Sequence, residues 1–283
     1  MKNICYKTIV LFVTAYFLLS VFSCKQSVKS TEIVFDTIRV DRNHFLANDT
    51  SGKLKCHLNI SFVYPKSFAD TLRQKQIQSV FIEKMLSKQF SHLSPEQAVE
   101  AYVQQYIKDF DASFSLENFD PEDYGLADEK IFSYEQHLEN EIVFRKDNFI
   151  SFIVESDAYE GGAHGSHHIS AYVLDTLTGE LLTQEDFAGL NYQKNVADVI
   201  IRKIAEANGV ETVEELENTG YINIKELEPN GNFTIDDKGI TYYFNEYEIA
   251  AFFIGVTKVF IPYREFSVYL IQDSPLSSLA GSQ

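Results

Sequence analysis

The residues best suited to chemistry lie in one short glycine-rich segment. It reads Tyr159-Glu160-Gly161-Gly162-Ala163-His164-Gly165. Glycine permits positive φ and a close approach of the backbone, so this spacing predicts a tight and sterically defined loop. A phosphate-binding loop would need a helix with a Lys-Ser/Thr pair after the glycines. An alternating, strand-like segment follows instead, which excludes a phosphate-binding loop.

Three histidines in and after this loop invite a metal hypothesis. Imidazole suits zinc, and three ligands from His164, His167 and His168 would leave a fourth coordination position open. Adjacent residues on a strand point to opposite faces, however, so His167 and His168 cannot easily converge on one ion. We therefore predict no metal and no cofactor. We expect His164 to be a hydrogen-bonded structural residue, and a functional role for it remains the alternative.

Carboxylates near the loop could support hydrolysis, and the candidates are Glu160, Asp175, Glu185 and Asp186. Residues 111–283 contain 32 carboxylates, so some will lie close together by chance. The chain has neither a Gly-x-Ser-x-Gly elbow nor a His-Glu-x-x-His helix. The sequence therefore predicts no catalytic residue, and an enzyme is less favoured than a binding protein.

The charge of the chain is strongly negative and unevenly distributed. The net charge is -17 over 283 residues, and residues 111–283 contain only 10 basic side chains. Such a field disfavours binding to nucleic acid or anionic lipid headgroups, and it would speed the encounter with a cationic partner. A simpler role for the same charge is solubility.

The N-terminus has the order of a secretory signal peptide. Lys2 and Lys7 precede an uncharged apolar run over 8–22, which is shorter than the roughly 20 residues of a membrane-spanning helix. Val21-Phe22-Ser23-Cys24 resembles the lipobox of bacterial lipoproteins. We expect residues 1–23 to be removed, Cys24 to carry lipid and residues 24–30 to form a polar tether. An uncleaved anchor or a different cleavage site is the alternative.

This interpretation places the mature protein outside the cytoplasm, lipid-anchored to a bacterial membrane at its periplasmic face or at the cell surface. Loss of residues 1–23 removes two lysines and no carboxylate, which changes the charge from -17 to -19. Cys56 then remains as the one free thiol, so the fold cannot depend on an internal disulfide. Cys56 alternates with apolar residues and is expected to be a buried, inert side chain.

The first half of the chain predicts strands followed by helices. Residues 55–64 alternate strictly between apolar and polar side chains, the period of a half-buried strand, and Pro65 is expected to end it. A strand over 33–40 should precede it. Helices are predicted over about 68–89 and from Pro95, where Ser94 and Gln97 form a capping box. Residues 111–130 are acidic and are expected to form a connection.

The second half predicts strands in neighbouring pairs. The pairs and single elements are a hairpin of 141–145 with 149–156, a strand over 168–175, a helix over 190–207, a hairpin of 232–235 with 240–244, and a closing strand over 256–261. This order favours an α+β fold over a parallel, doubly wound one. We expect antiparallel sheets with helices packed on one face and two subdomains, 31–130 and 131–272, followed by a tail, 273–283.

Two stretches resemble one known family. Residues 159–187, YEGGAHGSHHISAYVLDTLTGELLTQEDF, and residues 237–263, DKGITYYFNEYEIAAFFIGVTKVFIPY, are similar in order and pattern to extracytoplasmic domains of unknown function of the RsiV/PdaC type. Such domains form the outer part of the anti-sigma factor RsiV and the N-terminal part of the peptidoglycan deacetylase PdaC. No deacetylase domain follows Tyr263 here, so the resemblance implies an envelope module that binds a protein or a glycan.

The leading hypothesis is a non-catalytic binding or sensing module of the cell envelope. In RsiV the related domain is the receptor for lysozyme, so the expected ligand is a lysozyme-like cationic protein or a wall glycan. The candidate ligand loop consists of Tyr159, Gly161, Gly162, Ala163, His164 and Gly165, and the candidate binding surface consists of Tyr242, Tyr243 and Tyr247. The alternatives are a hydrolase or deacetylase acting on envelope polysaccharide, and a structural docking protein of the envelope.

Overall fold

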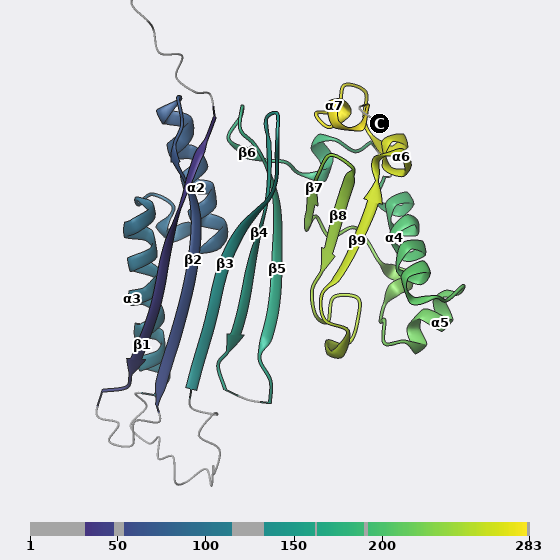
Figure 1. Cartoon of the computed structure of the whole chain (residues 1–283). Coiled ribbons are helices and arrows are strands. Elements are labelled where there is room, and N and C mark those ends of the chain that lie inside the picture. Colours follow the sequence, from purple (N-terminus) through teal and green to yellow (C-terminus); the bar gives the residue numbers. More distant parts are fainter. Residues whose placement is uncertain (1–31, 48–53, 115–132, 162, 190–191, 282–283) are drawn as a thin grey trace, which may run out of the picture. The chain divides into compact units, whose positions relative to one another are not determined.

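The computed structural model describes residues 32–47, 54–114, 133–161, 163–189 and 192–281 (Figure 1). The predicted lipidation site Cys24 and the predicted signal peptide lie outside these residues. From Ile33 onward the described chain forms one compact unit. None of the helices in these ranges has the length and apolarity needed to cross a membrane.

The first part of this unit is built on a six-stranded sheet in which the strands follow one another in chain order. The strands are β1 (Val34–Phe45), β2 (Lys55–Ser67), β3 (Ser133–Lys146), β4 (Phe149–Tyr159), β5 (Ser166–Asp175) and β6 (Glu180–Leu181). All neighbouring pairs are antiparallel except β2 and β3, which run parallel. A parallel pair needs a long crossover, and the two predicted helices lie in the stretch between these strands.

Strand β2 does not end at Pro65, as the sequence suggested. It continues to Ser67, with Pro65 opposite Phe35 at a shift in the register of β1 and β2. A proline cannot donate a ladder hydrogen bond, but it is tolerated at such an irregularity. The strand therefore ends three residues later than the predicted range of 55–64.

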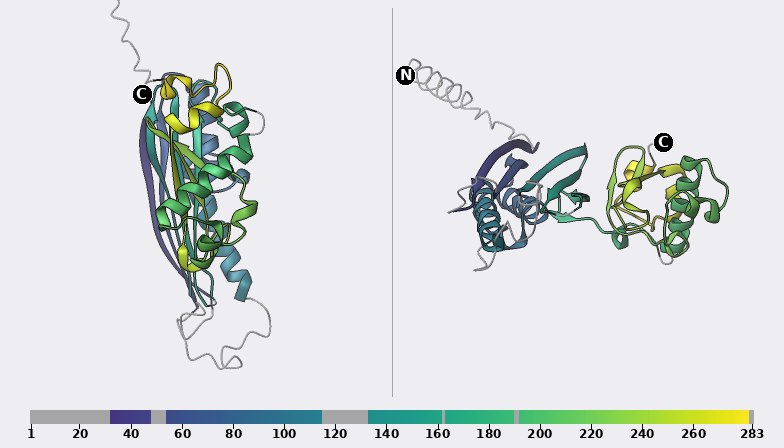
Figure 2. Two further views of the ribbon diagram at one scale, coloured as in Figure 1. Left: turned by 90° about the vertical axis from the view of Figure 1, so that its right-hand side faces the viewer. Right: turned by 90° about the horizontal axis from the view of Figure 1, so that it is seen from below.

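Helices α2 (Thr71–Met85) and α3 (Pro95–Phe114) cover one face of this sheet (Figures 1 and 2). The apolar side chains of β2 point to them, and their core includes Leu58, Ile60, Phe62 and Phe81. The predicted capping box is present, because Gln97 N–H donates to Ser94 Oγ and Ser94 N–H donates to Gln97 Oε1, each at 3.3 Å. Cys56 is buried on the same face, and burial raises the pKa of its thiol to about 11.

The second part is a three-stranded antiparallel sheet of β7 (Phe233–Ile235), β8 (Gly239–Phe244) and β9 (Thr257–Pro262). Helix α4 (Tyr192–Asn208) packs on it through buried side chains such as Val196 and Ile200. The shorter helices are α5 (Val213–Asn218), α6 (Tyr263–Phe266) and α7 (Ser277–Ala280), with single turns η1 (Lys88–Phe90), η3 (Gln184–Asp186), η4 (Ile224–Glu226), η5 (Phe252–Ile254) and η6 (Ser267–Tyr269). The expected α+β class with two subdomains is confirmed. The six-stranded sheet crosses the boundary predicted at 130/131, because β1 and β2 belong to the same sheet as β3 to β6.

Two asparagines join the free edge of β5 to the second sheet. Strand β6 pairs only with the last two residues of β5, so most of that edge lacks a neighbouring strand in its own sheet. Ile169 N–H donates to Asn245 Oδ1 at 2.7 Å, and Ala171 N–H donates to Asn232 Oδ1 at 2.6 Å. Asn232 and Asn245, here called the asparagine clamp, therefore satisfy edge groups that could otherwise recruit another chain.

Candidate functional site

The glycine-rich loop connects β4 to β5 and needs glycine for two different reasons. Gly161 has a φ of 85°, in the left-handed region. At Gly165 an added Cβ would lie 2.8 Å from the carbonyl oxygen of Ala158, which is too close for any other residue. Gly162 lies outside the described residues. The loop geometry therefore fixes where His164 can lie.

His164 is exposed and belongs to a row of three stacked rings. Its Nδ1 lies 2.8 Å from the carbonyl oxygen of Gly165. Because a carbonyl oxygen can only accept, Nδ1 carries the hydrogen and donates it. The imidazole stacks on Phe252 with ring centroids 4.1 Å apart, and Phe252 stacks on Tyr247 at 5.9 Å. We call His164, Phe252 and Tyr247 the aromatic stack. It joins the β4–β5 loop to the segment that follows β8.

Tyr247 occupies an unusual backbone position in this stack. Its φ is 65° and its side chain is 58% exposed. A bulky residue rarely adopts the left-handed region, which costs about 1–3 kcal/mol, and strain of this kind often occurs at functional sites. The Tyr247 N–H donates to the carbonyl oxygen of Ala250 at 3.0 Å, so a hydrogen-bonded turn holds this conformation and leaves much of the ring exposed.

The other two tyrosines expected at a binding surface are buried. Tyr242 is 0% exposed and Tyr243 is 7% exposed. Strand β8 is packed on both faces, because Tyr242 lies in the core formed with α4 and Tyr243 packs against Ile153, Ile169 and Ala171. Only Tyr247, which follows the strand, reaches the surface.

A hollow of about 380 Å³ lies beside Phe252 and is lined by carboxylates. We call it the acidic hollow, and its charged or polar lining residues are Glu135, His137, Asp157, Tyr159, Ser166, His167 and Glu246. The strand register explains their convergence, because Asp157 of β4 pairs with His137 of β3 and with His167 of β5. Successive odd-numbered residues of β4 share one face, and Tyr243 covers that face only as far as Ile153.

His167 is the histidine that this hollow surrounds with carboxylates. Its Nδ1 lies 2.6 Å from Asp157 Oδ1, and its Nε2 lies 3.6 Å from Glu155 Oε1. One ligand atom from each of Glu155, Asp157 and His167 lies within 4.8 Å of the others, so the three could hold a cation. Within the described ranges His164 and His168 do not join such a group.

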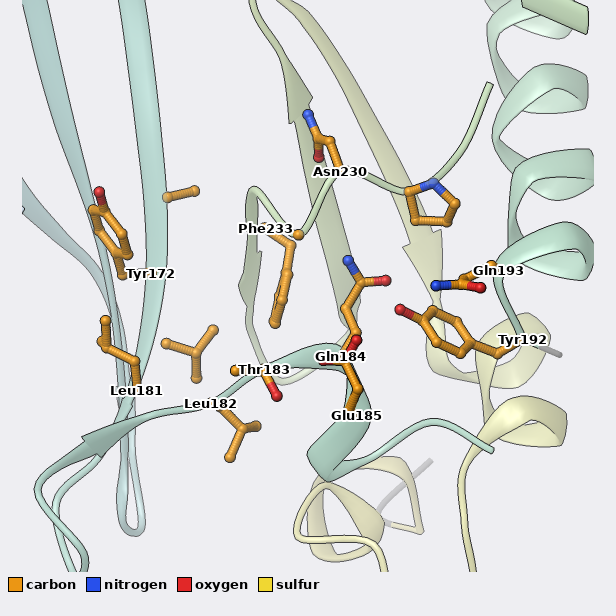
Figure 3. Close-up of a pocket in the computed structure, with 14 residues that line it drawn as sticks. Tyr172, Leu181, Leu182, Thr183, Gln184, Glu185, Tyr192, Gln193, Asn230 and Phe233 are labelled. Carbon is orange, nitrogen blue, oxygen red and sulfur yellow. The ribbon is translucent and has the colours of Figure 1, made fainter. Parts of the chain in front are cut away.

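A second hollow, of about 390 Å³, lies between β5, η3, the start of α4 and the loop 229–231 (Figure 3). We call it the neutral hollow, because Glu185 is the one charged residue among those that line it. Its other polar side chains are Tyr172, Thr183, Gln184, Tyr192, Gln193 and Asn230, and its apolar side chains include Leu181, Leu182 and Phe233. The pKa of Tyr192 is raised to about 12, mainly by burial of the hydroxyl and to a lesser extent by the negative charge of Glu185.

One segment of the chain matches the model of a protein family. Residues 181–264 match the model of DUF3298, described as a protein of unknown function. A member of the DUF3298 family from Bacteroides fragilis has a similar solved structure, with a TM-score of 0.79 and 25% identity over 89% of this chain and 99% of that one. A DUF3298 family protein from Pseudomonas aeruginosa shares the fold, with a TM-score of 0.59 and 14% identity over 86% and 96% of the two chains. No curated protein matches in sequence.

The DUF3298 segment supplies one side of each hollow. It contributes Glu246 and Phe252 to the acidic hollow, and Gln184 and Tyr192 to the neutral hollow. Strands β3 to β5 complete the acidic hollow, and β5 alone of these completes the neutral hollow. All three strands precede Leu181 in the chain. The candidate sites are therefore formed jointly by the DUF3298 segment and by the sheet before it.

The sequence indicated the glycine-rich loop but not the carboxylates that lie near it in the structure. Glu155, Asp157 and Glu246 were not singled out, although one signal was available for Asp157. A hairpin through the glycine-rich loop pairs residues equally far from its middle, which places position 157 opposite His167. Glu246 and the lining of the neutral hollow gave no local signal, because they depend on how the second sheet packs against β5.

Proposed function

We propose that this chain is a non-catalytic binding or sensing module of the cell envelope, and that its ligand is a cationic protein that docks at the acidic hollow. The observation that carries the proposal is the combination of carboxylates and exposed rings at one place. Glu135, Asp157 and Glu246 line the hollow, and Phe252 connects it to the aromatic stack. A lysine or arginine side chain could pair with the carboxylates and lie against a ring.

The composition of this surface is typical of a protein-binding site. Aromatic residues dominate the energetic centres of interfaces, and Tyr247 is both exposed and held in a strained backbone conformation. The excess of carboxylates in residues 111–283 would attract a basic partner from a distance and accelerate association. The lipobox-like sequence before Cys24 and the resemblance to RsiV/PdaC-type domains support an anchored position outside the cytoplasm and a lysozyme-like partner.

Isothermal titration with lysozyme tests this proposal. The chain from Lys25 retains the whole compact unit, and we expect it to bind lysozyme at low salt and more weakly at moderate salt. Screening over a Debye length of about 10 Å at 0.1 M weakens exposed charge pairs. Glu135→Gln and Glu246→Gln should each weaken binding about tenfold, or about 1.4 kcal/mol. Glu228→Gln, an exposed charge away from the hollow, is the matched control.

Tyr247 provides a second arm that separates binding from folding. Asparagine tolerates positive φ, so Tyr247→Asn should leave the melting temperature unchanged or raise it while weakening lysozyme binding. Absence of heat with lysozyme at both salt concentrations would eliminate the lysozyme version of the proposal. Equal binding by Glu246→Gln and Glu228→Gln would place the partner elsewhere on the surface.

A second candidate function is favoured by one specific observation, the pairing of His167 with Asp157 and Glu155. A carboxylate that orients an imidazole is the arrangement used for general acid–base chemistry, and a hydrolase or deacetylase of envelope polysaccharide could use it. His164 does not offer this arrangement, because its Nδ1 is occupied by the backbone. Release of reducing ends or acetate from cell-wall polysaccharide, lost in His167→Ala, would favour the enzyme over the binding module.

A further inference from the structure

Among the described residues, one buried polar group of the neutral hollow has no hydrogen-bond partner. Gln184 is 4% exposed, and its Oε1 accepts no hydrogen bond in the described part of the chain. A buried acceptor without a donor costs about 1–3 kcal/mol, which a purely structural side chain would not need to impose. Exchange for leucine would avoid that cost, so the amide points to a ligand.

The fold holds Gln184 firmly in this position. It begins η3, whose preceding residue Thr183 donates from its N–H and its Oγ1 to Asp186 Oδ2, at 2.7 and 2.8 Å. The backbone carbonyl of Gln184 in turn accepts from Ala188 N–H at 2.8 Å. A capping box of this kind fixes the direction in which the side chain leaves the backbone. The unsatisfied amide is therefore a consequence of a well-defined turn.

Other polar groups converge on the same point. The side chains of Gln184, Tyr192 and Gln193 direct their polar ends toward one another from η3 and from the first turn of α4 (Figure 3). Carboxamides offer both donors and acceptors, and a half-turn of the Gln184 amide exchanges Oε1 with Nε2. A ligand with many hydroxyl groups, each both donor and acceptor, matches this set.

We propose that the neutral hollow is a binding site for a neutral saccharide. Its volume of about 390 Å³ lies within the range of about 300–1,000 Å³ that is usual for small-molecule sites. No lysine or arginine lines it, which disfavours phosphorylated or carboxylated ligands, and Glu185 adds a single negative charge. Leu182 and Phe233 offer an apolar wall to the C–H face of a sugar ring. This site is separate from the acidic hollow and does not depend on the function proposed for it.

Titration of the full chain with two neutral probes tests the site. N,N′,N″-Triacetylchitotriose carries N-acetyl groups and cellotriose carries only hydroxyl groups, so the pair distinguishes the two kinds of neutral saccharide. We expect saturable binding of at least one of them by calorimetry or by ligand-observed NMR. Gln193→Ala, at an exposed position where folding is not at risk, should weaken it about tenfold. The matched control Gln104→Ala, an exposed glutamine on α3, should bind as the wild type does.

Gln184→Leu adds a readout that a structural role would not produce. If Gln184 is retained for a ligand, this variant should lose saccharide binding and melt at a higher temperature than the wild type. A lower melting temperature would show that the amide stabilises the fold, and it would overturn the argument. The site would also be overturned if neither saccharide bound, or if Gln193→Ala and Gln104→Ala bound equally. Lysozyme binding by Gln193→Ala should equal that of the wild type, so failure of one proposal leaves the other intact.

Discussion

The acidic hollow and the neutral hollow lie beside the same strand, yet they differ in charge and in construction. Ser166 and His167 at the start of β5 line the acidic hollow, and residues 171–173 farther along β5 line the neutral hollow. Between them Ile169 is 2% exposed and is held by Asn245. One strand therefore borders two chemically different surfaces because the second sheet covers its middle and leaves both sides of that contact open.

The two hollows also differ in how their residues are distributed along the sequence. Most groups of the acidic hollow come from alternate residues of three paired strands, so their spacing in the sequence is regular. The neutral hollow is formed by a turn, the start of a helix and a loop, with Gln184 and Asn230 far apart in the chain. A change in the contact that separates the hollows should affect both, whereas a change within η3 should affect only the neutral one.

Removal of the asparagine clamp at position 245 should have the largest effect. Asn245 is 4% exposed, and its amide accepts from Ile169 N–H at 2.7 Å and donates to Ile169 O at 3.0 Å. Asn245→Ala leaves Ile169 N–H without a partner and removes one of the two donors to Ile169 O, which keeps Asn232 Nδ2 at 2.8 Å. We expect a loss of about 3 kcal/mol in the free energy of unfolding by urea titration. Both lysozyme and saccharide binding should weaken.

The control for this variant is Asn218→Ala, an exposed asparagine at the end of α5. Its unfolding free energy should stay within about 0.5 kcal/mol of the wild type. Equal stability of the two variants would mean that β5 does not depend on the clamp. The separation between the two hollows would then need another explanation.

A second contact joins the sheets through Ser151. This side chain is fully buried, donates to the carbonyl oxygen of Ile235 at 2.7 Å and accepts from Ile235 N–H at 3.1 Å. Ser151→Ala should cost about 2 kcal/mol, because two groups of β7 lose a partner. Ser170→Ala, on the neighbouring strand, should cost less in the same urea titration. Lysozyme binding should persist in both variants, since neither residue lines the acidic hollow.

The sequence was sufficient for much of the fold because most elements have local causes. The alternation in β2, the capping box at Ser94 and the hairpin of β3 with β4 each depend on residues close in the chain. The parallel pairing of β2 with β3 had no such signal, because it depends on a crossover of more than sixty residues. Tyr242 could not be placed either, since burial of both faces of β8 follows from the packing of α4 and β5.

A smaller effect, confined to the neutral hollow, is expected from the cap of η3. Asp186→Ala removes the carboxylate that accepts from Thr183 N–H and Oγ1. Loss of such a cap costs about 1 kcal/mol, and the freed turn should let Gln184 move. Saccharide binding should weaken while lysozyme binding stays unchanged, with Glu180→Ala as the exposed control. Parallel weakening of both ligands would contradict the independence of the two hollows.

The smallest effect at neutral pH is expected for Tyr192→Phe, and it should appear only in alkali. Burial, and then the charge of Glu185, raises the pKa of Tyr192 from an ordinary value of 10.0 to about 12. The folded state therefore holds this proton more tightly than the unfolded state does, so its contribution to stability is complete below pH 10 and is lost as the pH rises toward 12.

Because phenylalanine has no proton to lose, the unfolding free energy of Tyr192→Phe should fall less steeply than that of the wild type between pH 10 and 12. Urea titrations at pH 7, 10 and 11.5 would measure the difference, with the exposed Tyr247→Phe as the control. Burial is the main cause of the raised pKa values of Tyr242 and Tyr263, and it acts in both proteins, so most of the difference comes from Tyr192. Identical slopes would mean that the Tyr192 hydroxyl is accessible to water. A hydrated hollow of that kind would favour a saccharide that binds through ordered water over one that contacts the ring directly.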